Sequence, residues 1–114
     1  MQEATITELD SNLSFEVKID NPPEIKQNFA TVYIDDKEVK RPNVTQSIGL
    51  IEVKAVSPSS EVNDFLLKWK DSKKRIDLML ETGETMYFMK GCSIKKFESP
   101  KKAFSVFYNS FKQA

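Results

Sequence analysis

Hydrophobic and polar side chains alternate along several short segments of this chain, which is the pattern of half-buried β-strands. Every second residue in 13–19 is hydrophobic, and Pro22 and Pro23 end that segment because proline cannot donate to a strand ladder. Residues 29–34 and 48–56 are rich in β-branched and other hydrophobic side chains. We therefore expect three strands in the first half of the chain.

The next segment predicts a short amphipathic helix at about residues 60–70. Hydrophobic residues recur there at i, i+3, i+4 and i+7, which places them on one helical face. They are Val62, Phe65, Leu66 and Trp69. Ser59 or Ser60 can cap the first turn. A helix of about three turns is too short to be stable alone in water, so we expect Phe65, Leu66 and Trp69 to pack on a sheet.

A β-hairpin is predicted directly after the helix. Residues 75–81 and 85–89 alternate on either side of a turn at 82–84, which contains a glycine. Gly91 then predicts a kink or bulge before a further strand at 93–97.

Residues 103–111 fit two patterns. A helical face would contain Phe104, Phe107, Tyr108 and Phe111, whereas the alternation expected of a strand is less regular. We favour a strand because residues 104–111 contain no strong helix former, and aromatic and β-branched residues lose rotamer freedom in a helix.

Residues 35–47 are polar and contain Pro42, so we expect a long loop that begins with a turn at Asp35-Asp36-Lys37 and can include a short strand at Val39. Two adjacent aspartates also resemble ligands for a divalent cation. Aspartate is common in turns for backbone reasons, however, and we prefer that interpretation.

Together these elements predict one domain over residues 1–114 of the mainly β class, a small antiparallel β-barrel or sandwich with one short α-helix. A chain of this length can bury a hydrophobic core. No apolar run approaches the roughly 20 residues needed to span a bilayer, so we expect no membrane association.

The sequence lacks the residues on which most catalytic and metal sites depend. It contains no His, so neither a Ser-His-Asp nor a Cys-His arrangement can form. Cys92 is the only cysteine, and we interpret it as a small buried hydrophobic residue. No glycine-rich phosphate-binding motif occurs. We therefore expect no enzymatic activity, no metal and no cofactor.

The order of elements from residue 48 to residue 111 resembles that of the tail-tube proteins of contractile phages and the related type VI secretion tubes. In that family a strand enters a short helix at the mouth of a small β-barrel, and a hairpin with a glycine turn and aromatic-rich paired strands follow. The corresponding positions here are 51–53, 65–69, 76–80, Gly83 and 105–108.

The resemblance implies a structural subunit. Six copies would join their sheets into a ring, and rings would stack into a hollow tube that conducts DNA, without sequence-specific binding, or an effector protein. The implied partners are further copies and sheath, baseplate or terminator proteins, and the implied location is a virion tail assembled in the host cytoplasm. Secretion and bacteriocin tubes remain alternatives, as does a terminator or baseplate component.

In the resembling family, the loop corresponding to residues 35–47 reaches a neighbouring subunit. The length, proline and mixed charge of this segment favour the same role here. The residues that we expect at such an inter-subunit contact are Lys37, Lys40, Arg41, Pro42 and Asn43.

Charge is distributed unevenly although the formal net charge is zero. Residues 1–24 hold six acids and one base, whereas residues 68–75 hold five bases and one acid and residues 90–114 hold six lysines and one acid. If these blocks lie at opposite ends of the subunit, copies would stack head to tail through opposite charges. The surface that we expect comprises Glu3, Glu8, Asp10, Lys73, Lys74 and Arg75. Simple solvation of the surface is an equal alternative.

Two other classes of protein are considered. A pleckstrin-homology-like adaptor would require residues 103–111 to be helical, with Lys73, Lys74 and Arg75 as a site for membrane headgroups or for a protein partner. A small enzyme is the third class, and the missing chemistry argues against it.

Overall fold

The computed structural model describes residues 1–46, 48–98 and 100–114, with only the backbone described at 26–30 and 41–46. Nine strands and one helix lie within these ranges. In chain order they are β1 (Gln2–Glu8), β2 (Ser14–Ile19), β3 (Lys26–Ile34), β4 (Lys37–Gln46), β5 (Gly49–Ala55), α1 (Ser60–Ser72), β6 (Ile76–Glu81), β7 (Met86–Glu98), β8 (Ala103–Tyr108) and β9 (Ser110–Gln113).

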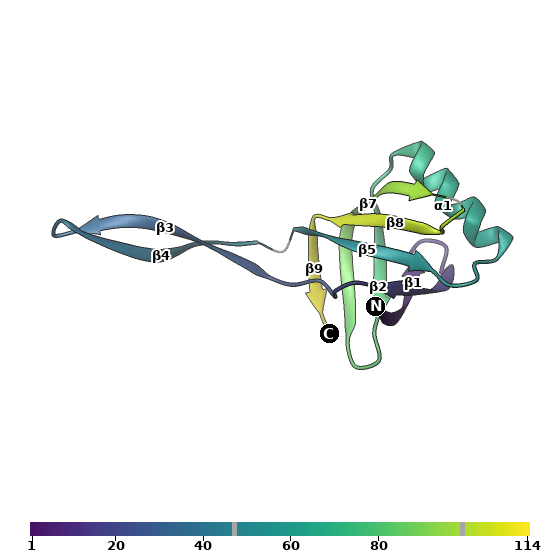
Figure 1. Cartoon of the computed structure of the whole chain (residues 1–114), viewed down its shortest axis with the longest axis horizontal. Helices are drawn as coiled ribbons and strands as arrows, with labels where there is room; N and C mark the ends of the chain where they lie inside the picture. The colour runs from purple at the N-terminus through teal and green to yellow at the C-terminus, as the bar shows by residue number, and fades with distance from the viewer. Residues whose placement is uncertain (47, 99) are drawn as a thin grey trace.

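Six of the strands close an antiparallel barrel. Their order is β6-β1-β2-β5-β8-β7, and a pairing between β6 and β7 completes the circle (Figure 1). β9 lies outside this circle and pairs with the first part of β7. The predicted mainly β class with one short helix is confirmed, and the structure is a barrel.

Strand β7 is long enough to pair with three other strands. Its first part pairs with β6 and β9, and its second part pairs with β8. The two parts meet at Gly91, which has a φ of +63° and donates its N–H to Asp77 Oδ1 at 3.1 Å. The predicted irregularity at Gly91 is therefore confirmed, but the strands expected at 85–89 and 93–97 are one continuous strand.

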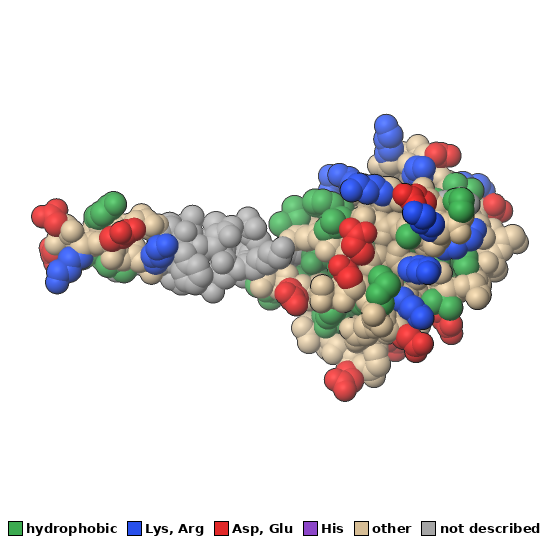
Figure 2. Space-filling model, viewed as in Figure 1, with side chains coloured by type: hydrophobic (Ala, Val, Ile, Leu, Met, Phe, Trp, Pro, Cys, Tyr) green, Lys and Arg blue, Asp and Glu red, His purple; other side chains and the backbone are tan. Residues whose placement is uncertain are grey.

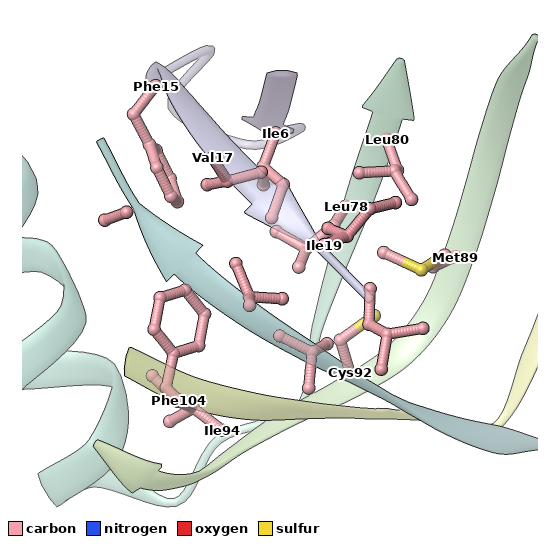
Figure 3. Close-up of a cluster of buried hydrophobic side chains, with 14 of the residues drawn as sticks. Ile6, Phe15, Val17, Ile19, Leu78, Leu80, Met89, Cys92, Ile94 and Phe104 are labelled. Atoms are coloured by element: carbon pink, nitrogen blue, oxygen red, sulfur yellow. The ribbon is translucent and has the colours of Figure 1, made fainter. Parts of the chain in front are cut away.

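The barrel is filled by the hydrophobic positions of the alternating strands. Figure 3 shows Ile6, Val17, Ile19, Leu78 and Leu80 directed into one cluster from three neighbouring strands. All five side chains are at most 1% exposed. Because the side chains of a strand alternate between its two faces, the same strands present polar residues to solvent.

Helix α1 begins and ends as its sequence suggests. The Ser59 side chain accepts a hydrogen bond from the Val62 N–H at 3.2 Å, so Ser59 is the N-cap. Leu66 and Trp69 are buried, and the Phe65 ring is half-buried with its centroid 6.2 Å from that of Phe15. This face packs on the barrel.

Two strands besides β7 differ from the sequence-based expectation. The predicted loop at 35–47 is wrong, because β4 occupies Lys37–Gln46 and pairs with β3 in a two-stranded sheet. Strand β1 was not predicted at all. The preference for strands at 103–111 is confirmed by β8 and β9, so the terminal helix that a pleckstrin-homology-like adaptor requires is not present in the described residues.

Strands β3 and β4 form a ribbon that projects from the barrel, and we call residues 26–46 the arm (Figure 1). The arm gives the molecule its elongated shape, with extents of 64 × 31 × 25 Å. It leaves the barrel on the side away from α1 (Figure 1).

Candidate assembly surfaces

The tip of the arm is a tight turn between Ile34 and Lys37, which are paired across the ribbon. Asp35 and Asp36 form the turn with φ angles of +50° and +62°. Two positive φ values are the mark of a type I′ turn, whose twist matches that of the flanking strands. Aspartate tolerates this conformation better than most residues, so the predicted turn at Asp35-Asp36-Lys37 is confirmed.

The outer part of the arm exposes hydrophobic side chains. Tyr33 is 73% exposed and Ile34 is 42% exposed. A two-stranded ribbon has no second layer to cover such residues, and an isolated hairpin is marginally stable in water. The arm is therefore a segment that gains stability if another molecule covers it.

The predicted inter-subunit residues all lie on β4, in the arm and not in a loop. Lys37 and Lys40 are exposed near the tip. The side chains of Arg41, Pro42 and Asn43 lie outside the described residues. The backbone of Pro42 is registered opposite Phe29, next to a register shift between Asn28 and Phe29.

Tyr108 and Gly49 meet where the arm joins the barrel. Gly49 opens β5 and is registered opposite Tyr108 of β8. Tyr108 is only 3% exposed, and burial is the main cause that raises the pKa of its hydroxyl. A larger residue at 49 would meet the phenol ring directly, so the base of the arm is closely packed.

Several hydrophobic side chains are exposed around the base of the arm. Ile25 is 63% exposed, Ile48 42% and Leu50 47%. Ile25 also lines a broad open hollow of about 830 Å³. It is lined by Pro22, Pro23, Glu24, Ile25, Tyr87, Phe111, Lys112 and Gln113. Exposed apolar residues that gather at one place are typical of surfaces that contact other proteins.

Glu8 does not belong to an exposed charged surface, so this part of the prediction is wrong. Its side chain is 5% exposed, and one carboxylate oxygen accepts hydrogen bonds from the Ser11 N–H at 2.5 Å and the Ser11 hydroxyl at 2.6 Å. Burial acts to raise the pKa of Glu8, but the bonds from Ser11 and the Asp10 backbone outweigh it and lower the pKa from its ordinary value of 4.5. Through these hydrogen bonds, the Glu8 side chain stabilises the turn between β1 and β2.

The basic residues after α1 are exposed and held in place by the end of the helix. Lys73 is the C-cap in a left-handed conformation, and its N–H donates to Trp69 O at 3.2 Å. The Trp69 indole N–H donates to Lys74 O at 3.0 Å. Arg75 donates to Asn109 Oδ1 at 2.8 Å. Trp69 therefore connects the core to the basic segment.

The acidic block does not lie wholly at the end of the barrel opposite the basic segment 68–75, as stacking through opposite charges would require. The Leu9 N–H donates to Asp77 O at 3.2 Å, which places the turn that carries Asp10 beside the start of β6, immediately after Arg75. Glu3 lies toward the other end of β1. In Figure 2, acidic and basic side chains are interspersed over the visible face of the barrel.

A smaller hollow of about 260 Å³ lies at the C-terminal half of α1, and we call it the basic hollow. It is lined by Phe65, Lys68, Trp69, Ser72, Lys74 and Ile76. The rings of Phe65 and Trp69 are stacked with centroids 5.8 Å apart and planes at 27°. Its lining therefore combines an aromatic surface with two lysines and no acid.

Few of the described side chains are of the types that commonly bind metals or act in catalysis. Among the described residues, no group of three or more His, Cys, Asp or Glu side chains could hold a metal ion. Cys92 is buried, and burial raises the pKa of its thiol to about 12, so it is protonated at neutral pH. No helix in the part of the chain that the structure describes is long and apolar enough to cross a membrane.

The sequence matches no protein-family model, and no curated protein shows significant similarity to it. The fold, however, is similar to a chain in the cryo-EM structure of an extracellular contractile injection system, the PVC sheath/tube terminator in its extended state. The TM-score is 0.65 at 10% identity, and the similarity covers 97% of this chain and 92% of the other. The barrel, the helix and the arm thus have a fold similar to that of a chain from an extracellular contractile injection system.

Proposed function

We propose that this chain is a structural subunit of a contractile tail or injection system that assembles into a ring at the tube. The fold similarity supports a position at the end of the tube, as a terminator, over the tube proper. In this role the subunit has no catalytic activity, and its partners are further copies together with tube and sheath proteins. Six copies would form the ring, whose lumen lets DNA or an effector pass.

The observation that carries this proposal is the arm. It is a ribbon of two strands that stands away from the barrel and exposes Tyr33 and Ile34 to solvent. In an isolated molecule such a ribbon gains little from burial and loses conformational entropy on ordering. Contact with a neighbouring copy offsets that loss, which is why we assign the arm, including Lys37 and Lys40, to the inter-subunit contact.

Strand edges support the same assignment. β5 pairs with β2 only through Val53, Lys54 and Ala55, so its first residues have β8 as a partner on one side alone within the described residues. β9 pairs with β7 on one side. Unpaired strand edges promote the addition of strands from another chain, and closure into a ring removes them.

Light scattering after gel filtration, combined with negative-stain microscopy, tests the proposal. The full chain should form rings, and a variant with residues 26–46 replaced by a four-residue Gly-Ser linker should be a folded monomer. As a control, the same linker inserted at Gly83 lengthens the β6–β7 turn and leaves the arm intact. A full chain that stays monomeric at high concentration would overturn the proposal.

The same experiment separates the two positions in the tail. A tube protein should grow into long tubes without help, because each ring offers the next the same surface. A terminator should stop at single rings and should bind only to the ends of preformed tubes.

A further inference from the structure

We propose that the tip of the arm of one copy docks in the basic hollow of a neighbouring copy. This inference rests on the proposed function, because it names the receptor for the arm within the assembly. The observations that carry it are the chemistry of the hollow, the chemistry of the tip and their places on the molecule.

The basic hollow is built to receive side chains from another protein. At about 260 Å³ it lies below the roughly 300–1,000 Å³ of typical small-molecule pockets. Its apolar surface is formed by Phe65, Trp69 and Ile76, and Lys68 and Lys74 bring positive charge to it. Both lysines are exposed, and the described structure records no salt bridge for either.

The tip of the arm has the complementary composition. Asp35, Asp36 and Glu38 are all exposed, and Lys37 is the one base among them, so residues 33–38 carry three acids and one base. Tyr33 is the most exposed of the large hydrophobic side chains in the described structure. Tyr33 is registered opposite Glu38, which places an aromatic ring and a carboxylate on the same face of the ribbon.

These two surfaces match in two independent ways. The phenol ring of Tyr33 can pack on the half-buried ring of Phe65, which stacks on the buried Trp69, since aromatic pairs favour offset or edge-to-face contact. The carboxylates of Asp35 and Asp36 then meet the ammonium groups of Lys68 and Lys74. Burial of an aromatic anchor inside a charged rim is the usual anatomy of a protein–protein contact.

The placement of the two surfaces requires a second copy. The arm leaves the barrel on the side away from α1, so the tip and the helix that forms the hollow lie toward opposite ends of the long axis (Figure 1). The tip of one chain therefore cannot fold back into its own hollow. A contact between two different surfaces is head to tail, and such contacts close into rings when the rotation between copies allows it.

The acidic turn at Asp10 is another candidate partner for the basic residues after α1. That turn lies on the same chain, beside the start of β6, and it offers no aromatic side chain. The arm tip provides both the charge and the aromatic ring.

Charge exchange tests the docking. Two variants reverse one side each, Asp35→Lys with Asp36→Lys at the tip and Lys68→Glu with Lys74→Glu at the hollow. Each should raise the concentration at which rings form by at least about tenfold, because like charges would then face each other across the contact. A chain that carries all four changes should regain assembly. Lys18→Glu with Lys54→Glu, an exposed cross-strand pair on the barrel, is the control and should have little effect.

A cross-link provides a second measurement that does not depend on charge. Asp36→Cys with Lys74→Cys should give disulfide-linked oligomers under mild oxidation, since Cys92 is buried. Suppose that the full chain forms rings and no cross-link forms. If the reversals are then harmless, or if they impair assembly and the fourfold variant does not restore it, the arm docks elsewhere and only this inference fails. A full chain that forms no rings overturns the proposed function as well.

Discussion

The backbone of Gly49 lies directly against the phenol ring of Tyr108. A Cβ added at position 49 would lie 2.7 Å from Tyr108 Cζ, closer than real Cβ atoms approach other atoms. The tyrosine is 3% exposed and belongs to the core, so it has little room to move. This contact lies where the chain leaves the arm and enters the barrel.

We expect Gly49→Ala to reduce the free energy of unfolding by about 1–3 kcal/mol, because overpacking a filled site forces neighbouring side chains from their rotamers. Urea unfolding followed by fluorescence measures the change. Gly83→Ala is the matched control, since a Cβ there meets nothing within 4 Å. Equal stability of the two variants would show that Tyr108 can move aside.

Trp69→Ala should cost about 3–5 kcal/mol of unfolding free energy, as is usual for removal of a large buried aromatic side chain. Trp69 is 4% exposed, stacks on Phe65 and donates its indole N–H to Lys74 O. Leu67→Ala, on the same helix but at a position that is 41% exposed, should cost far less. A loss below about 1 kcal/mol for Trp69→Ala would be typical of a surface substitution and would contradict the packing of α1 on the barrel.

The parts of the fold that could be predicted from the sequence are those with a strong local pattern. The helix was predicted because Val62, Leu66 and Trp69 repeat at helical spacing after a serine cap. Strand β2 was predicted because its hydrophobic and polar residues alternate, and each of its hydrophobic residues does face the core. Here local pattern and tertiary burial agree, which is the condition under which sequence reasoning succeeds.

Strand β4 could not be recognised in the same way. In the arm neither face is packed on the barrel, so the sequence has no reason to alternate, and Pro42 argued against a strand. Proline is nevertheless tolerated in a two-stranded ribbon, because its ring can take the place of an N–H that points outward. The positive φ values at Asp35 and Asp36 identify a tight hairpin turn only after the structure is known.

Strand β1 was missed, and Glu8 was wrongly assigned to an exposed charged surface, for a different reason. Ala4, Ile6 and Glu8 alternate inward on β1, but a charged residue at the last inward position interrupts the hydrophobic alternation. The β-branched run Thr5-Ile6-Thr7 was the available signal. The burial of Glu8, and the proximity of Asp10 to the start of β6, depend on how β1 pairs with β6, and pairing between distant strands is not encoded in local composition.

Glu8 should make stability depend on pH in the acid range. The pKa of Glu8 is lowered in the folded protein, so the unfolded state binds the proton more tightly. The ionised carboxylate therefore stabilises the fold at pH values above the ordinary pKa of 4.5. This stabilisation is lost as the pH falls through the pKa of the folded state. Glu8→Gln should therefore lower stability at neutral pH and flatten the loss below about pH 4.5. Thermal unfolding between pH 7 and pH 3 measures this, with Glu3→Gln as an exposed control on the same strand. Parallel pH profiles for wild type and Glu8→Gln would contradict the role of the Ser11 hydrogen bonds.

The arm should unfold without the barrel when its turn is disrupted. Asp35 has a φ of +50°, whereas proline fixes φ near −65°, so Asp35→Pro is incompatible with the hairpin turn. Asp36→Gly is the matched control, because glycine adopts the +62° found at that position without strain. Hydrogen exchange followed by NMR should show loss of protection at 31–40 in Asp35→Pro, while the amides of the barrel strands stay protected and the thermal transition of the barrel is unchanged.

The same variant should fail to form rings, whereas Asp36→Gly should form them. A barrel transition that falls together with arm protection would mean that the arm and the barrel fold as one cooperative unit.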